Sequence, residues 1–187
     1  MHSSLAPLLF VAFLLLASAI AAPMSTKEGL DYLEANRLKE GVNVLPSGLQ
    51  YKVLASATSP TALSPNVSTT CHVHYRGTTV KGAEFDSSYK RGKPTQFAPQ
   101  DVIAGWKEAL LIMREGDKWE VTVPAELAYG KRSMGEHISP GSVLVFEMEL
   151  VKVDAATPGM WGAVNKFLPA FARNIPLGVW AFLAYFL

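Results

Sequence analysis

The chain of 187 residues is poor in cysteine, in clustered basic residues and in charge at its two ends. A single cysteine, Cys71, excludes an internal disulfide and a zinc site built from several thiolates. A formal net charge of +1 and the lack of any Lys/Arg-rich run argue against a nucleic-acid partner. Residues 1–22 contain no Lys, Arg, Asp or Glu, and residues 155–187 contain only Lys166 and Arg173. The charged residues therefore lie almost entirely in a middle section, 23–154, which is long enough for one globular domain. This distribution of charge excludes a polytopic membrane protein and a disordered chain.

The uncharged N-terminal end is typical of a secretory signal peptide. An apolar stretch over residues 8–16 is followed by small residues up to Ala22, and Ala19 and Ala21 have the A-x-A spacing that signal peptidase accepts. The apolar stretch is short for a membrane-spanning helix, which needs about 20 residues, and this favours cleavage over the alternative of an uncleaved anchor. We predict a signal peptide over residues 1–22 and hence a secretory location: the endoplasmic reticulum lumen, the cell surface or the exterior.

The C-terminal end, residues 155–187, is a hydrophobic tail. Its uninterrupted apolar run, residues 175–187, is too short to cross a hydrocarbon core of about 30 Å as a helix. Attachment to a membrane through residues 167–187 is one interpretation, either as an interfacial segment or as the signal for a lipid anchor. Packing of the tail on its own domain or on a partner is the other.

The middle section alternates between two kinds of pattern. Ser25-Thr-Lys-Glu28 has the form of a capping box with Ser25 as N-cap, followed by an amphipathic helix that runs up to Gly41, so residues 23–47 are expected to be a helix and a linker. A second helix is expected to open at Pro99 and to run to Met113. Strand-like alternation covers residues 49–54, 69–75, 119–123 and 143–153. This order predicts an α+β fold in which an antiparallel β-sheet wraps around one short α-helix.

Two further features of this section could carry chemistry. His72 and His74 would point to the same face of a strand and could bind a metal, but no third ligand is apparent, and we assign no metal site. Cys71 alternates with these histidines and is expected to be a core residue. Asn66-Val-Ser68 is an N-glycosylation sequon in a Ser/Pro-rich loop, which makes Asn66 a glycosylation candidate in an exported protein.

Six short motifs occur in order over residues 48–154. They are Val73-His-Tyr-Arg-Gly77, Phe85-Asp-Ser-Ser88, Arg91-Gly-Lys-Pro94, Val102-Ile-Ala-Gly-Trp106, Ala128-Tyr-Gly130 and Leu144-Val-Phe146. Together they resemble the FKBP-type peptidyl-prolyl cis-trans isomerases. The preceding Leu45-Pro-Ser-Gly-Leu-Gln-Tyr51 and the short helix look like the macrophage-infectivity-potentiator subgroup of that family.

The resemblance implies an apolar cup that holds the proline of an X-Pro bond. Catalytic roles would fall to Tyr75, Asp86, Ile103 and Tyr129, and substrate binding to Phe85, Arg91, Phe97, Val102, Trp106, Ile138 and Phe146. In this interpretation Trp106 forms the floor of the cup, the Tyr129 hydroxyl and the Ile103 backbone N–H hold substrate carbonyls, and Asp86 orients the pocket through Tyr75 or Arg91. Proline-containing polypeptides of the secretory pathway are the implied clients, macrolide FKBP inhibitors the implied ligands, and no cofactor is expected.

The residues at the rim depart from the pattern common in the family. Thr95 stands where many members carry an aromatic side chain, Asp101 where many carry Glu, and Met134 in a loop where other residues are common. These departures concern substrate preference and macrolide affinity. A proline-binding module or chaperone that needs little turnover is the alternative function.

Overall fold

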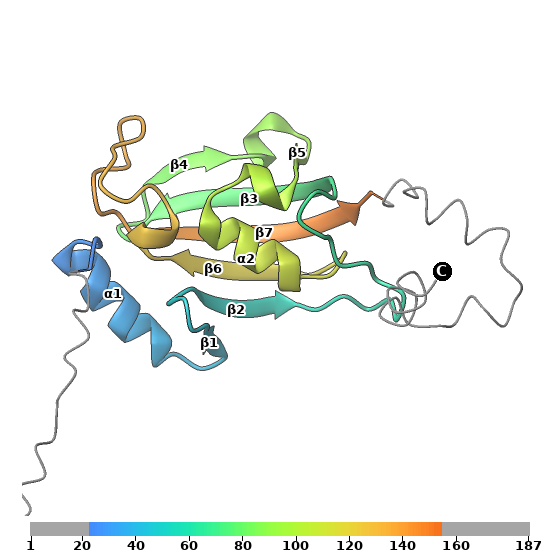
Figure 1. Ribbon diagram of the computed structural model, residues 1–187, viewed down its shortest axis with the longest axis horizontal. Coiled ribbons are helices and arrows are strands. Elements are labelled where there is room, and N and C mark those ends of the chain that lie inside the picture. Colours follow the sequence, from blue (N-terminus) through green and yellow to red (C-terminus); the bar gives the residue numbers. More distant parts are fainter. Residues whose placement is uncertain (1–22, 155–187) are drawn as a thin grey trace, which may run out of the picture.

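A computed structural model describes residues 23–154, which form an antiparallel sheet with a helix lying across one face (Figure 1). The predicted signal peptide and the hydrophobic tail lie outside these residues. The α+β class is confirmed: the sheet wraps around one helix, α2, and a second helix, α1, precedes it in the chain. Within residues 23–154 no helix is both long and apolar enough to span a membrane.

The sheet has seven strands in the spatial order β1-β2-β6-β7-β3-β4, and β5 also pairs with β3. The elements in chain order are α1 (Lys27–Arg37), β1 (Val42–Val44), β2 (Gln50–Ala55), β3 (Cys71–Thr79), β4 (Glu84–Ser87), the 3-10 helix η1 (Tyr89–Arg91), β5 (Thr95–Phe97), the 3-10 helix η2 (Pro99–Asp101), α2 (Ala104–Ile112), β6 (Lys118–Val123), the 3-10 helix η3 (Ala125–Leu127) and β7 (Leu144–Val153). The short strands β1, β4 and β5, of three or four residues each, were not predicted, because so few residues cannot show a clear alternation.

The two central strands, β3 and β7, follow the predicted alternation. Cys71, Val73 and Tyr75 are buried on the face of β3 that meets α2, and His72 and His74 lie on the other face. On β7 the buried set is Leu144, Phe146, Met148 and Leu150. Alternate side chains of a strand point to opposite faces, so these two strands supply much of the core.

Helix α2 begins later than the sequence predicted. Pro99 opens only the short helix η2, and the backbone is extended at Val102 and Ile103 before α2 starts at Ala104. Both side chains are β-branched and pack against the core, and β-branched residues are well suited to extended backbone. The consequence is that Ile103 is the N-cap of α2 rather than a residue of its second turn.

Helix α1 is capped by Thr26, and the prediction of Ser25 as N-cap is wrong. The Thr26 Oγ1 accepts a hydrogen bond from Gly29 N at 3.1 Å, as an N-cap side chain does. The Ser25 hydroxyl is already used elsewhere, in hydrogen bonds with Glu126 and Ala125. The helix also ends at Arg37, before the predicted Gly41.

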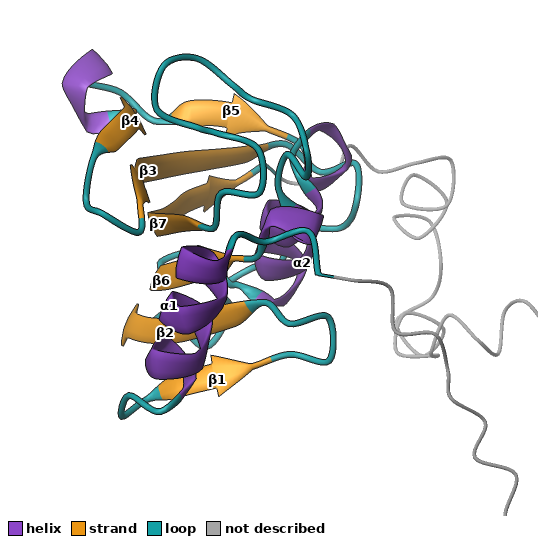
Figure 2. Ribbon diagram, turned by 90° about the vertical axis from the view of Figure 1, so that its left-hand side faces the viewer, coloured by secondary structure: helices purple, strands orange, loops and turns teal. Residues whose placement is uncertain are grey.

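Helix α1 packs on the domain and is anchored there by polar contacts. Figure 2 shows it in front of β2 and β6, at one end of the sheet. The Asn36 side-chain amide donates to Gln50 Oε1 at 2.9 Å, and the Gln50 amide donates to Leu33 O at 2.9 Å. At the first turn Gly29 lies directly against Val143, just before β7. These contacts place α1 on its own domain.

Candidate active site

An aromatic cluster centred on Trp106 lies between α2 and the sheet. Trp106, on α2, is only 5% exposed. Its ring centroid lies 4.9 Å from Tyr75 on β3, 5.5 Å from Phe97 on β5 and 5.2 Å from Phe146 on β7, each in an edge-to-face arrangement. Phe85 on β4 adds a fifth ring, 5.6 Å from Phe146. Edge-to-face pairs are favourable beyond their buried area, so five elements converge on one rigid aromatic floor.

Gly77 makes room for two of these rings. A Cβ atom at this position of β3 would lie 2.7 Å from the Phe85 ring and 3.0 Å from the Phe146 ring, closer than ordinary van der Waals contact. The glycine that ends the first of the six motifs is therefore required by packing at the site.

The polar side of the site is a network of Tyr75, Asp86 and Arg91. The Tyr75 hydroxyl donates to Asp86 Oδ2 at 2.5 Å, and Arg91 Nη1 pairs with Asp86 Oδ1 at 2.6 Å. Arg91 Nη2 also donates to the Tyr75 hydroxyl, at 2.8 Å, and to Thr95 Oγ1, at 3.1 Å. The sequence left open whether Asp86 acts through Tyr75 or through Arg91, and in the structure it contacts both.

The network changes the acid–base properties of its members. Burial by itself would raise the pKa of Asp86, but hydrogen bonds from Tyr75 and Arg91 outweigh it and hold that pKa below its ordinary value. Burial, together with the neighbouring Asp86, raises the pKa of the Tyr75 hydroxyl. Asp86 is thus an anion, and Tyr75 a neutral donor, throughout the physiological pH range.

Ser88 and Thr95 support the network, and sequence reasoning missed both roles. Ser88 Oγ accepts from Tyr75 N at 2.8 Å and donates to Tyr75 O at 3.2 Å, so a fully buried hydroxyl fixes the backbone that carries Tyr75. Thr95 was singled out only as a departure at the rim, whereas its hydroxyl accepts from Arg91. Neither role has a spacing signal: Ser88 meets Tyr75 only when the chain folds back on β3, and Thr95 meets Arg91 across the short turn between η1 and β5.

The remaining predicted site residues belong to the hydrophobic core that contains Trp106. Ile138 is buried in this core, while Val102, Ile103 and Tyr129 are half-buried and pack against it. Among residues 23–154, no group accepts a hydrogen bond from the Ile103 N–H or from the Tyr129 hydroxyl. The predicted catalytic and substrate-binding residues therefore lie in the polar network or in and against this core, and two donors among them have no acceptor within the described residues.

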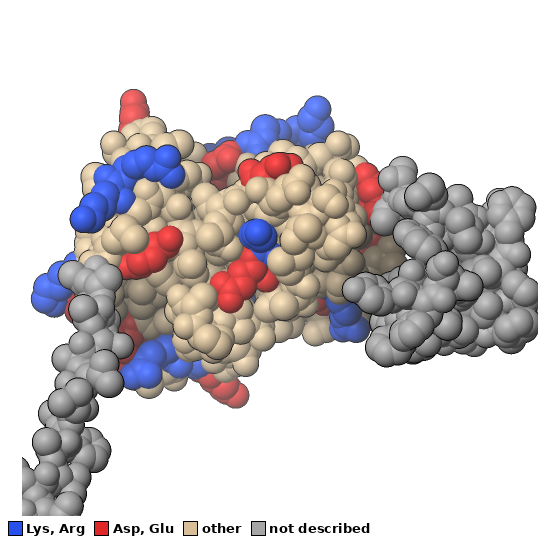
Figure 3. Space-filling model, viewed as in Figure 1, with Lys and Arg blue, Asp and Glu red and all other residues tan. Residues whose placement is uncertain are grey.

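The two histidines considered for a metal lie on the other face of the sheet. His72 Nε2 is 3.2 Å from Asp154, and His74 contacts Ser88 and stacks on Tyr89 with ring centroids 4.7 Å apart. In the described part of the chain no three His, Cys, Asp or Glu side chains gather closely enough to hold a metal ion. Figure 3 shows charged side chains of both signs scattered over the α2 face, including its middle, with uncharged surface between them.

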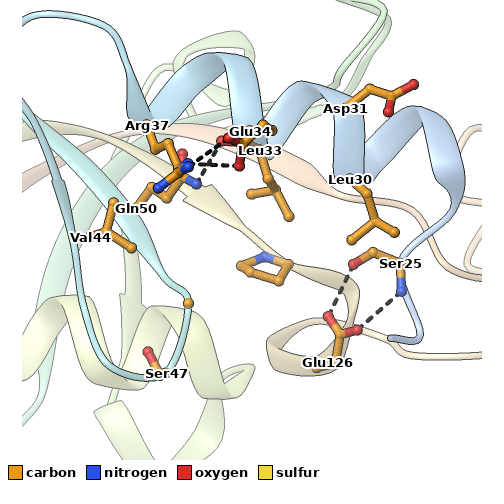
Figure 4. Close-up of a pocket in the computed structure, with 12 residues that line it drawn as sticks. Ser25, Leu30, Asp31, Leu33, Glu34, Arg37, Val44, Ser47, Gln50 and Glu126 are labelled. Atoms are coloured by element: carbon orange, nitrogen blue, oxygen red, sulfur yellow. Dashed lines mark hydrogen bonds and ion pairs between the residues drawn. The ribbon is translucent and has the colours of Figure 1, made fainter. Parts of the chain in front are cut away.

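A separate groove of about 540 Å³ lies between α1, the turn before β2 and the residues after β6 (Figure 4). Leu30, Arg37, Val44 and Glu126 are among its lining residues. None of the predicted site residues lines this groove, so it is distinct from the aromatic site.

Comparisons with known proteins agree with this geometry. Residues 62–151 match the family model described as FKBP-type peptidyl-prolyl cis-trans isomerase, and residues 17–53 match the domain amino-terminal to it. The outer membrane protein MIP of Legionella longbeachae is 47% identical over 129 residues, which are 69% of this chain and 54% of that protein. The macrophage infectivity potentiator of Trypanosoma cruzi is 43% identical over 122 residues, which are 65% of this chain and 61% of that protein.

Two crystal structures share the fold. FkpA from Escherichia coli has a TM-score of 0.64 at 40% identity, over 69% of this chain and 59% of that one. A peptidyl-prolyl cis-trans isomerase from Pseudomonas syringae has a TM-score of 0.62 at 33% identity, over 69% of this chain and 92% of that one. The chain belongs to the FKBP-type peptidyl-prolyl cis-trans isomerase family. It spans about half to three fifths of the length of the curated relatives it matches.

Proposed function

We propose that this protein accelerates rotation about X-Pro peptide bonds in client polypeptides of the secretory pathway. The observation that carries the proposal is the aromatic floor around Trp106, bordered by the Asp86–Tyr75–Arg91 network, in a chain of the FKBP family. Such a site offers an apolar cup for a proline ring and polar groups for the adjoining carbonyls.

The chemistry needs neither a nucleophile nor a cofactor. Rotation about an X-Pro bond has a barrier of about 18–20 kcal/mol, because it destroys the amide resonance. A twisted amide is less delocalised than a planar one, so an apolar cup favours it over the ground state. An acceleration of about 10³–10⁵-fold requires only about 4–7 kcal/mol of differential stabilisation, which a few contacts can supply.

The geometry suggests a role for each part of the site. The Ile103 N–H and the Tyr129 hydroxyl hold substrate carbonyls, and Tyr129 stabilises a carbonyl whose dipole has turned out of the amide plane. Asp86 holds Tyr75 and Arg91 in place at the edge of the cup. The proline ring lies on Trp106, against the apolar side chains of Phe85, Phe97, Val102, Ile138 and Phe146. Macrolide inhibitors compete for the same cup.

A protease-coupled assay on a proline tetrapeptide tests the proposal. Phe97→Ala removes one wall of the cup and Asp86→Ala breaks the polar network, so each is expected to lower kcat/KM at least about tenfold, a loss of roughly 1.4 kcal/mol or more. Leu38→Ala, an exposed apolar residue of α1, and Asp31→Ala, an exposed carboxylate, are the matched controls. A wild-type chain that leaves the uncatalysed rate unchanged would refute the proposal.

We further propose export through a signal peptide over residues 1–22, attachment of the protein to a membrane through residues 167–187, and a glycan on Asn66. One relative is named an outer membrane protein, which supports an exported location. Asn66 is exposed, and its Oδ1 accepts from the Ser68 N–H and hydroxyl, so the asparagine and the serine of the sequon lie side by side at the surface. Mass spectrometry of the protein purified from its source tests these proposals. It should report an N-terminus near Pro23, a glycan on Asn66, and the C-terminal residue of the mature protein with any lipid attached to it.

A further inference from the structure

The N-terminal residues Met24–Thr26 lie against the neck of the loop that follows Tyr129. Gly141 N donates to Gly130 O at 2.8 Å, which closes residues 130–141 into a loop with a narrow neck. Thr26 N donates to Gly141 O at 2.9 Å, so the residue that caps α1 is bonded directly to one side of that neck.

Glu126 ties the same N-terminal residues to the other side of the loop. Its carboxylate accepts from Met24 N at 2.5 Å, from Ser25 N at 3.1 Å and from the Ser25 hydroxyl at 3.0 Å (Figure 4). Ser25 Oγ in turn accepts from Ala125 N at 3.0 Å, and Ser25 is buried. Hydrogen bonds to a carboxylate are stronger than those between neutral groups, so three of them to one exposed glutamate form a specific clamp.

The two glycines of the neck, Gly130 and Gly141, pack directly against Met24 and Thr26. A Cβ atom on Gly141 would lie 2.7 Å from Met24 O and 3.1 Å from Thr26 Cγ2. Across the neck, a Cβ atom on Gly130 would lie 3.5 Å from Met24 Sδ. Both glycines also have positive φ, so each end of the loop combines a turn with a direct contact to the N-terminal segment.

The loop contributes to the aromatic site. Tyr129 directly precedes Gly130, and Ile138 is a buried member of the hydrophobic core that also contains Trp106. An antiparallel β-bridge joins Met134 and Ile138, since each backbone N–H donates to the other residue's carbonyl. This bridge holds the two sides of the loop together at its far end. A shift of the neck would therefore move Tyr129 and Ile138 together, and small displacements of positioning groups are costly for catalysis.

We propose that Glu126, through its clamp on Met24 and Ser25, is a positioning residue that sets Tyr129 and Ile138 for substrate binding and isomerisation. The inference rests on the proposed isomerase function and adds to it a control by the segment just before α1. Loss or displacement of this segment would loosen the loop while leaving the sheet and α2 intact.

The test measures isomerase kinetics, affinity for a proline tetrapeptide and amide hydrogen exchange in the full chain. Glu126→Ala removes all three acceptor bonds, Ser25→Ala removes one of them, and Glu126→Gln keeps an oxygen for the two backbone donors. Glu136→Gln, an exposed residue of the same loop, is the matched control. We expect kcat/KM to fall about tenfold in Glu126→Ala, which loses all three hydrogen bonds to the carboxylate. In Ser25→Ala and Glu126→Gln, which keep the two bonds from backbone donors, we expect kcat/KM to fall about threefold. Exchange should quicken in residues 130–141 but not in β3 or β7.

The outcomes separate the clamp from the proposed function. A residue with a merely structural role would lower the free energy of unfolding but leave kcat/KM per folded molecule unchanged, and that result, or unchanged exchange in the loop, would overturn the proposal. A wild type that binds the peptide without accelerating its isomerisation would refute the proposed function alone. In that case the dissociation constants of the variants for the peptide test the proposed role of Glu126. Weaker peptide binding by Glu126→Ala than by Glu136→Gln supports that role, and equal binding overturns it.

Discussion

At the scale of single residues, Asp86 shows how a charge is retained beside an apolar pocket. Its two oxygens are divided between a neutral donor, Tyr75, and a cationic donor, Arg91, so neither oxygen faces the aromatic rings without a partner. A carboxylate held in this way stays ionised and fixes the direction of both donors. The residue therefore links the electrostatics of the site to its geometry.

The lowered pKa of Asp86 predicts a pH-dependent stability difference between the wild type and Asp86→Asn. A carboxylate whose pKa is lower in the folded state stabilises the fold above its ordinary pKa of about 3.9, and that contribution disappears as pH falls through the folded-state value. The side chains of Asp86 and Arg91 are both 42% exposed, so we expect about 1 kcal/mol or less at pH 7 and a smaller difference at pH 2. Urea unfolding at the two pH values checks this, and an equal difference at both would contradict it.

The sequence predicted single residues best where periodicity decides their face. The alternation along β3 and β7 correctly separated buried from exposed side chains, and the family motifs named the residues that meet at Trp106. Ser88, Thr95 and Glu126 were not predicted to act at the site. Each is a common polar residue whose partner depends on the folded backbone. Ser88 and Glu126 bond to residues 13 or more positions away, and Thr95 bonds to Arg91 across a local turn whose geometry the sequence pattern does not show.

At the scale of elements, α1 is attached to the sheet mainly by buried amides. Asn36 is 2% exposed and donates to Gln50 across the helix–sheet boundary, while Leu38, just after the helix, is 75% exposed. A helix of eleven residues is marginal on its own, so these contacts hold it in place.

Replacement of Asn36 by Ala should destabilise the protein by about 1–3 kcal/mol, because the buried Gln50 oxygen loses its donor. Asn43→Ala, at an exposed position of β1, should change stability by less than about 0.5 kcal/mol. Denaturant unfolding of both variants provides the comparison. Equal effects would show that the amide contact does not anchor α1.

Helix α2 lies unusually close to β6 at Gly105. Alanine there should favour the helix by about 1 kcal/mol, but its Cβ would lie 2.5 Å from Val123 Cγ1. Overpacking of a core typically costs about 1–3 kcal/mol, so we expect Gly105→Ala to be destabilising. The Val123→Ala substitution should lower the free energy of unfolding less in the Gly105→Ala variant than in the wild type, because it removes the atom that clashes. Thermal unfolding of the wild type, both single variants and the double variant gives the coupling energy between the two sites. A Gly105→Ala variant that is more stable than the wild type would contradict this prediction.

The elements differ in how well the sequence predicted them. The long strands and both helices were expected from their patterns, and the fold class followed from their order. The helix starts were wrong, because the Ser25 hydroxyl is taken by Glu126 and Ala125 and because Val102 and Ile103 are extended against the core. Both errors arise where tertiary contacts compete with a local signal.

At the scale of the whole molecule, the single cysteine reports on the integrity of the fold. Cys71 is fully buried on β3, and burial, with Asp154 nearby, raises the pKa of its thiol to about 11. The reactive species is the thiolate, so a disulfide reagent at pH 8 should label native protein far more slowly than protein in denaturant. Absorbance of the released chromophore measures both rates, and equal rates would show that β3 is open in solution.

The domain as a whole places its functional groups on one side of the sheet. The α2 face carries the aromatic floor, the polar network and the loop after Tyr129, while the opposite face of β3 carries the two histidines. The N-terminal segment reaches this arrangement at the loop neck, so α1 is connected to the site as well as to the sheet.

The proposed function requires the cup around Trp106 to accelerate the isomerisation of X-Pro bonds and not only to bind them. Exchange spectroscopy by NMR measures the cis–trans rate of a proline tetrapeptide directly, in the presence of catalytic amounts of the full chain. Uncatalysed isomerisation takes tens to hundreds of seconds. We predict exchange at least about 10³-fold faster, with this acceleration reduced at least about tenfold in Phe97→Ala and retained in Leu38→Ala. A peptide that binds the protein but isomerises at its uncatalysed rate would contradict the claim.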